Sequence, residues 1–124
     1  MVKETKQHFD NNGNLVEEIE LLNDHWHGKR KIWNSSGVLI AEGEYLYGVA
    51  NGRSRTWYDN GTIHIDCSTV NGELHGSYRS FWRNGQLKEE GSYYKGKKTG
   101  LYKWYNMDGS FWRECIFEET EEAK

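Results

Sequence analysis

The chain has 124 residues, of which 35% are hydrophobic, and its formal net charge at pH 7 is −3. This length suits one modest domain, and so polar a composition argues against a large enzyme with a thick core around a buried cleft. A chain without basic excess is also a poor partner for the phosphate backbone of a nucleic acid. Aromatic residues make up 15% of the chain, far more than disordered segments contain, so the chain is expected to fold.

Glycines recur with a fixed period of 24 residues. An Asn-Gly dipeptide or a close relative stands at Asn12-Gly13, Ser36-Gly37, Asn60-Gly61, Asn84-Gly85 and Asp108-Gly109. A second register holds Gly28, Gly52, Gly76 and Gly100, and a third holds Gly48, Gly72 and Gly96. A fourth register admits only small residues: Gly43, Cys67, Gly91 and Cys115. The chain is therefore predicted to be one repeat domain.

In chain order, the domain begins with a partial repeat over residues 1–27. Full repeats follow over 28–51, 52–75 and 76–99, and a C-terminal repeat over 100–118 precedes an acidic tail over 119–124. Each Asn-Gly dipeptide predicts a two-residue type I′ hairpin turn, because both central residues of that turn need a positive φ. The glycines of the third register turn the chain back again. We expect strands of about six to nine residues.

Opposite charges provide a test of this register. With Asn60-Gly61 as a two-residue turn, Asp59 faces Thr62, Tyr58 faces Ile63, and Arg55 faces Asp66. The same count pairs Lys31 with Glu42, Arg79 with Glu90, and Lys103 with Glu114. Four opposite-charge pairs are thus predicted to lie directly across the ladder, which glycine spacing alone does not require.

The predicted fold is all-β: a single-layer, elongated antiparallel meander of about ten strands built from 24-residue hairpin repeats. No segment has a helical period, and aromatic residues fall on both faces of the expected sheet. Open edges are the liability of such an array. The acidic run Glu118, Glu119, Glu121 and Glu122 is expected to protect one of them.

The segment from Gly76 to Gly100 resembles the variant form of the MORN repeat. It contains Phe81-Trp82, Asn84-Gly85, Tyr93-Tyr94 and Gly96-Lys97. The preceding unit is similar but looser, with Thr69-Val70 in place of the aromatic pair, and the resemblance extends over about residues 8–118. It implies two functions: bacterial proteins built of such repeats are described as antitoxins, and eukaryotic ones as scaffolds linked to acidic phospholipids.

Candidate metal and catalytic residues do not converge in the expected sheet. His27 and His75 occupy the same register, and His25 lies two residues before His27. His27 and His75 are two repeats apart, however, which separates them by about four strands, or nearly 20 Å. Cys67 and Cys115 are equally distant, so we expect free thiols in a small-residue site. No nucleophile, base and orienting group occur together. We therefore expect neither an enzyme nor a metal site nor a cofactor.

The preferred hypothesis is a non-catalytic module that binds a protein in the cytoplasm, and the favoured partner is a cognate toxin. The candidate partner-binding residues are Trp57, Tyr58, Trp82, Trp104 and Trp112. The alternative is a scaffold that binds acidic lipid headgroups through Lys29, Arg30, Lys31, Arg53, Arg55, Lys97 and Lys98. The sequence leaves the oligomeric state open.

Overall fold

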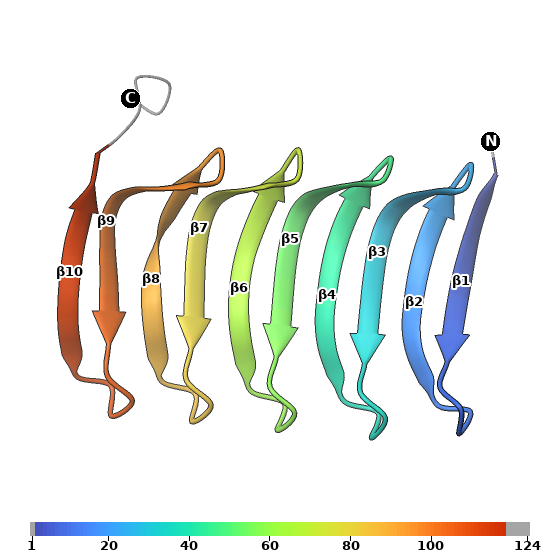
Figure 1. The fold of residues 1–124 in the computed structure, drawn as a ribbon, viewed down its shortest axis with the longest axis horizontal. Helices are drawn as coiled ribbons and strands as arrows, with labels where there is room; N and C mark the ends of the chain where they lie inside the picture. Colours follow the sequence, from blue (N-terminus) through green and yellow to red (C-terminus); the bar gives the residue numbers. More distant parts are fainter. Residues whose placement is uncertain (1, 119–124) are drawn as a thin grey trace.

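The computed structural model describes residues 2–118, which form one antiparallel sheet of ten strands paired in chain order (Figure 1). The strands are β1 Lys3–Phe9, β2 Leu15–Leu22, β3 His25–Trp33, β4 Leu39–Leu46, β5 Val49–Trp57, β6 Ile63–Val70, β7 Glu73–Phe81, β8 Leu87–Tyr94, β9 Lys97–Tyr105 and β10 Phe111–Phe117. The predicted all-β, single-layer meander is confirmed. Of the acidic run predicted to protect an edge, Glu118 is the last described residue, and Glu119, Glu121 and Glu122 lie outside the described residues.

The turns at the Asn-Gly register are three-residue loops, so the prediction of two-residue type I′ turns is wrong there. At the first of them the amide of Gly13 donates to the carbonyl of Asp10 (3.0 Å), and the amide of Asp10 donates to the carbonyl of Asn14 (2.9 Å). Only the glycine of this loop has a positive φ, 84°. This pattern is a type I turn followed by a left-handed residue, the next most common way to close a hairpin.

Asparagine favours this loop for a local reason. The Oδ1 atom of Asn60 accepts a hydrogen bond from the amide of Thr62 (3.0 Å), which satisfies the backbone donor directly after the loop. The longer loop shifts the pairing beside it by one residue. Tyr58 therefore faces Thr62 and Trp57 faces Ile63, in place of the predicted pairs Asp59 with Thr62 and Tyr58 with Ile63.

A bulge then restores the predicted register. His64 is left without a direct partner between Ile63 and Ile65, where the pairing of β5 and β6 is irregular. Beyond the bulge Arg55 lies opposite Asp66, as predicted. The extra loop residue and the bulge cancel each other, because each shifts the register by one residue in opposite senses.

The type I′ turns are found at the opposite ends of the strands, where they connect each hairpin to the next. Asn71 and Gly72 have φ values of 52° and 83°. Both φ values are likewise positive in Asn23-Asp24, Tyr47-Gly48 and Lys95-Gly96. Each of the three glycine turns also contacts the preceding hairpin, as where the amide of Gly72 donates to the carbonyl of Ala50 (2.8 Å). These backbone bonds link successive repeats directly.

The second glycine register lies within strands, where it allows a sharp bend. Gly52 has a φ of 127°, and a Cβ atom placed on it would lie 2.6 Å from Oε2 of Glu44. Both facts exclude a larger residue. Strands β3, β5, β7 and β9 each bend strongly near their start, where this register falls (Figure 1).

The small-residue register provides the sites where large side chains are buried. Tyr102 is the only large side chain that is fully buried among the described residues. Its ring lies over Gly91, where an added Cβ atom would be 2.0 Å from Cδ2 of Tyr102. Cys67, in the same register, faces Tyr78 and is 8% exposed. At Cys67 and Gly91 the size limit thus follows from the rings of the next strand, whereas Gly43 faces Ser54 there.

We predict that Gly91→Ala destabilises the protein by roughly 1–3 kcal/mol, because the methyl group would displace the buried ring of Tyr102. Gly43→Ala is the matched control, since its Cβ atom would lie 3.6 Å from Tyr45, an ordinary contact. Urea denaturation of both variants measures the difference. Equal losses of stability would contradict this account of the register.

Candidate functional site

Alternating charges cross the sheet from β2 to β10 on one face. The row consists of Glu18, Lys31, Glu42, Arg55, Asp66, Arg79, Glu90, Lys103 and Glu114, each opposite the next. Directly opposed residues of an antiparallel sheet share a face, so these side chains form one continuous line, here called the charge ladder. The four predicted pairs within hairpins are confirmed. The other four pairs link successive hairpins and were not predicted.

Two ladder cations, Arg55 and Arg79, form ion pairs within the sheet. The Nη2 atom of Arg55 lies 2.8 Å from Oε1 of Glu42, and so pairs with the strand before it and not with the predicted partner Asp66. Asp66 instead lies 2.9 Å from Nη2 of Arg53 and 3.8 Å from that of Arg79. The hydrogen bond from Arg53 lowers the pKa of Asp66 below its usual value. The ladder therefore neutralises much of its own charge.

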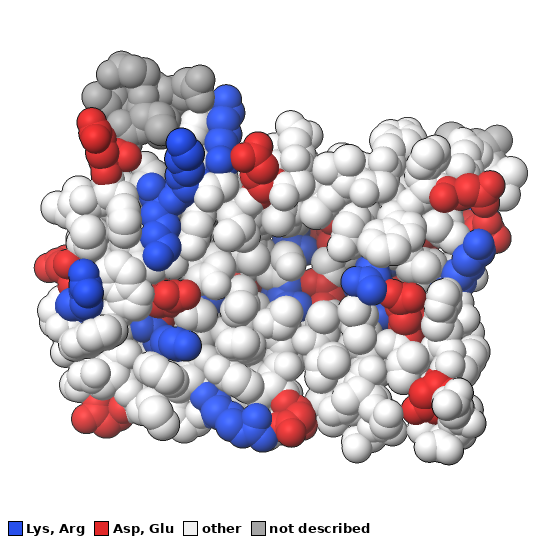
Figure 2. Space-filling model, in the orientation of Figure 1, with Lys and Arg blue, Asp and Glu red and all other residues white. Residues whose placement is uncertain are grey.

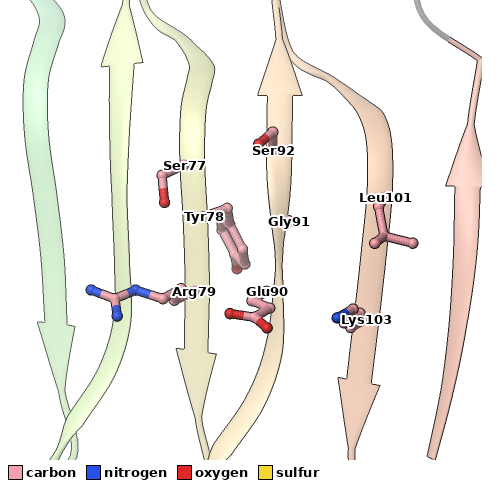
Figure 3. Close-up of a pocket in the computed structure, with 8 residues that line it drawn as sticks. All are labelled: Ser77, Tyr78, Arg79, Glu90, Gly91, Ser92, Leu101 and Lys103. Carbon is pink, nitrogen blue, oxygen red and sulfur yellow. The ribbon is translucent and has the colours of Figure 1, made fainter.

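A shallow hollow lies on the ladder face between β7 and β9 (Figure 3). Arg79, Glu90 and Lys103 lie at one level across it, and small side chains such as Ser77 and Ser92 line it further along the strands. The Oε1 atom of Glu90 accepts a hydrogen bond from the hydroxyl of Tyr105 (2.9 Å). Arg79 lies 3.8 Å from Asp66, and the groups that line the hollow include no nucleophile with a base beside it.

Tyrosine at this level is equally unsuited to acid–base chemistry. Burial, with a smaller contribution from Glu89, raises the pKa of Tyr78 to about 12. A phenol with that pKa stays protonated near neutral pH and cannot serve as a general base there.

The histidines singled out by the sequence have a role in turns. The Nδ1 atom of His27 accepts a hydrogen bond from the amide of Tyr47 (3.2 Å), and that of His75 does so from Lys95 (3.4 Å). Asn51, the residue in the same register of the intervening repeat, accepts from the amide of Asn71 in the same way (3.2 Å). Residues 2–118 contain no group of three side chains that could hold a metal ion. The register supplies an acceptor for the next type I′ turn.

The cysteines lie where the small-residue register places them. Cys67 and Cys115 are free thiols, and burial raises the pKa of Cys67. A buried thiol with a raised pKa forms little thiolate, so it packs as a small apolar side chain.

Three of the candidate partner-binding aromatics make contacts within the sheet. Tyr58 donates its hydroxyl hydrogen to the carbonyl of Phe81 (2.7 Å), and Nε1 of Trp82 donates to the carbonyl of Tyr105 (3.2 Å). Trp57 lies beneath the guanidinium group of Arg55, 5.2 Å from the ring centre. The hydrogen bonds of Tyr58 and Trp82 recur 24 residues apart and join neighbouring hairpins, whereas Arg55 and Trp57 lie on the same strand, β5. All three aromatic residues are half-buried.

The other two candidates belong to one group at the β10 end of the sheet. Arg113 lies over the rings of both Trp104 (5.1 Å) and Trp112 (5.8 Å). Tyr102 packs against Trp104 at 4.9 Å, and Lys98 lies 4.8 Å from the Tyr102 ring. We call these five residues the C-terminal aromatic cluster. Lysine and arginine side chains gather over β8 to β10 on the face shown in Figure 2.

This cluster is open to solvent at its outer side. Trp112 is 59% exposed, and Phe111 and Ile116 on the same strand are more than half exposed. The sequence did not single out Arg113, which is only one of 16 basic residues until the fold brings it over two rings, and it named Lys98 only as a candidate lipid contact. The arrangement provides large rigid rings with a cation between them, which is suited to recognition and not to catalysis.

These features define a repeat module without an evident catalytic arrangement in its described part. Two segments, residues 26–47 and 74–95, match the family model described as MORN repeat variant. The segments lie two periods apart, and each ends at a type I′ turn, so the resemblance is confirmed for these two repeats. MORN repeats are binding modules for proteins or lipids. Comparison with curated proteins and with solved structures finds no match.

The described residues include no helix that could cross a membrane.

We predict that Asp66→Asn lowers the free energy of unfolding by about 1 kcal/mol at neutral pH, because the carboxylate is only 16% exposed beside two arginines. The folded-state pKa of Asp66 is below 3.8, so its contribution is present above that pH and lost as pH falls through the folded value. Denaturation of both proteins across this range measures the difference, which should vanish in acid.

The control for this variant is Asp59→Asn. Asp59 pairs with Arg83, but its side chain is 64% exposed, so the expected loss is below about 0.5 kcal/mol. A difference for Asp66 that does not change with pH would show that the charge is not what stabilises the sheet.

Proposed function

We propose that the chain is a non-catalytic module that binds a protein partner through the C-terminal aromatic cluster, and that it acts as an antitoxin or immunity-type protein by neutralising that partner. The observation that carries the proposal is Arg113 between Trp104 and exposed Trp112. Tryptophan, tyrosine and arginine are the residues that most often dominate binding energy at protein interfaces. A cluster already held in place loses little conformational entropy on binding.

Two features support neutralisation: the described residues contain no catalytic arrangement, and the chain is acidic. A module without a catalytic arrangement in its described part can inhibit an enzyme only by covering it, which an extended sheet does well. The net charge of −3 favours approach to a basic partner. The cytoplasm, where such a partner would act, is part of this proposal.

The lipid alternative is less well supported by the positions of the basic residues. Arg30 pairs with Glu17, and Arg53 and Arg55 pair with Asp66 and Glu42. Lys98 lies over the aromatic rings of the cluster. Most of the cations expected to meet lipid headgroups are therefore engaged within the sheet. Co-sedimentation with anionic vesicles at physiological salt should leave the protein in solution.

We predict that Trp112→Ala weakens binding to the partner at least tenfold, because it removes an exposed ring stacked on Arg113. The partner to test first is the product of the reading frame adjacent to the gene, which is co-expressed and titrated by calorimetry. Phe9→Ala is the matched control, since Phe9 is also exposed, at 57%, but lies on β1 at the opposite edge.

The control variant should bind within about twofold of the native chain. Growth of cells that express the partner reports neutralisation separately from binding. Unchanged affinity in Trp112→Ala, or a partner that is harmless to cells, would refute the corresponding half of the proposal.

A further inference from the structure

The two edges of the sheet have opposite character. Strand β1 has the sequence KETKQHF, is exposed throughout, and carries charged side chains that discourage pairing with another strand. Strand β10 has the sequence FWRECIF and exposes Phe111, Trp112 and Ile116. No strand within residues 2–118 pairs with the outer side of β10 (Figure 1). An apolar edge of this kind is a ready template for an added strand.

The charge ladder specifies one side chain of such a strand. Three acidic ladder residues, Glu42, Asp66 and Glu90, each lie between two basic ones, as Glu90 lies opposite Arg79 on β7 and Lys103 on β9. Glu18 differs, because it faces Lys31 on β3 but Gln7 on the edge strand β1. The last ladder residue, Glu114, has only one such neighbour, Lys103. It is exposed, whereas Glu90 is half-buried. The residue that would complete the ladder beyond Glu114 is a lysine or an arginine.

The small-residue register specifies the adjacent side chain. In the two repeats nearest β10, Tyr78 faces Cys67 and the ring of Tyr102 covers Gly91, and each ring belongs to the strand that follows the small residue. Earlier in the chain, Gly43 instead faces Ser54. Cys115 holds the same position on β10, and no following strand covers it within the described residues. In Tyr78-Arg79 and Tyr102-Lys103 the aromatic residue directly precedes the ladder cation. A strand added to β10 is therefore expected to contain an aromatic–basic dipeptide.

We propose that the outer edge of β10 binds an antiparallel strand of the partner protein, whose Lys or Arg faces Glu114 and whose preceding aromatic residue covers Cys115. The affinity comes from main-chain hydrogen bonds along the edge, and the dipeptide sets the register. The inference rests on the proposed function only in assigning the added strand to a partner protein. The chemistry of the strand follows from the sheet itself.

A second copy of this chain fits the edge poorly. In β1 the position of the ladder cation is occupied by Gln7, opposite Glu18, and the position of the covering ring by Lys6, opposite Ile19. Strand β1 of a second copy would therefore offer neither side chain. Two β10 strands paired symmetrically about Glu114 would oppose two carboxylates. A strand of another protein with the aromatic–basic dipeptide supplies both the cation opposite Glu114 and the ring over Cys115.

The test uses a fluorescein-labelled peptide with the sequence of β9, residues 97–105, because β9 already contacts β8 in the required way. Binding to the full chain is followed by fluorescence anisotropy. We expect saturable binding, and we expect Glu114→Lys to weaken it by about tenfold by placing two cations opposite each other. The peptide with Lys103→Glu should regain that factor on the Glu114→Lys protein.

Two matched measurements locate the site. Glu4→Lys makes the same charge change on exposed β1 and should leave peptide affinity within twofold. Amide hydrogen exchange on addition of peptide should slow in β10 and not in β1. Circular dichroism of each variant confirms that the sheet is folded before it is titrated.

Absence of peptide binding to the folded chain would overturn the proposal, as would a charge-swapped peptide that binds both proteins equally. Sedimentation that shows a dimer dissociated by Glu114→Lys would also overturn it, since a second copy would then cover the edge. Because the probe is a synthetic peptide, these results are independent of whether the partner is a toxin and is neutralised.

Discussion

A sheet with no layer packed on either face can bury a side chain only beneath the side chains of neighbouring strands. Within residues 2–118 this constraint shapes both faces of the molecule. Tyr102 is buried because Gly91 leaves room under its ring, and the ladder carboxylates other than Glu114 are half-buried beside cations of adjacent strands. A period of 24 residues places the same kind of side chain at the same level of every repeat, so each row across the strands is complementary. The hydrophobic effect acts here between side chains of adjacent strands, and this burial allows a polar chain to fold.

The same constraint gives the β10 end its binding character. Every interior strand receives side-chain cover from both neighbours, whereas β10 receives it from β9 alone. Its rings and its last ladder carboxylate are therefore exposed together, next to Arg113. Strand β1 occupies the equivalent position at the other edge but has exchanged the ladder cation and the covering ring for Gln7 and Lys6. One edge thus discourages pairing while the other retains the pattern that accepts it.

The repeat period predicted the fold, the strand order and the opposition of Arg55 and Asp66, because all three follow from spacing. The turn types could not be assigned from the Asn-Gly dipeptide, which suits two kinds of hairpin loop; the choice depends on hydrogen bonds such as that of Asn60 and on the bulge at His64. Of the candidate binding residues, Trp104 and Trp112 meet through Arg113, whereas Tyr58 and Trp82 bond to the next hairpin. Trp57 lies against Arg55 of its own strand. Composition suggested aromatic residues, but only the three-dimensional arrangement separates those that pack inside the sheet from those that face a partner.

The most direct test of the single-layer account is a set of cross-strand nuclear Overhauser effects from NMR of the folded chain. The account predicts backbone contacts from Arg55 to both Glu42 and Asp66, and the equivalent contacts at each interior ladder residue. It also predicts that β1 and β10 show no contact with each other, since eight strands separate them. Contacts between β1 and β10, or Arg55 with a neighbour on one side only, would show a closed or layered structure and contradict the account.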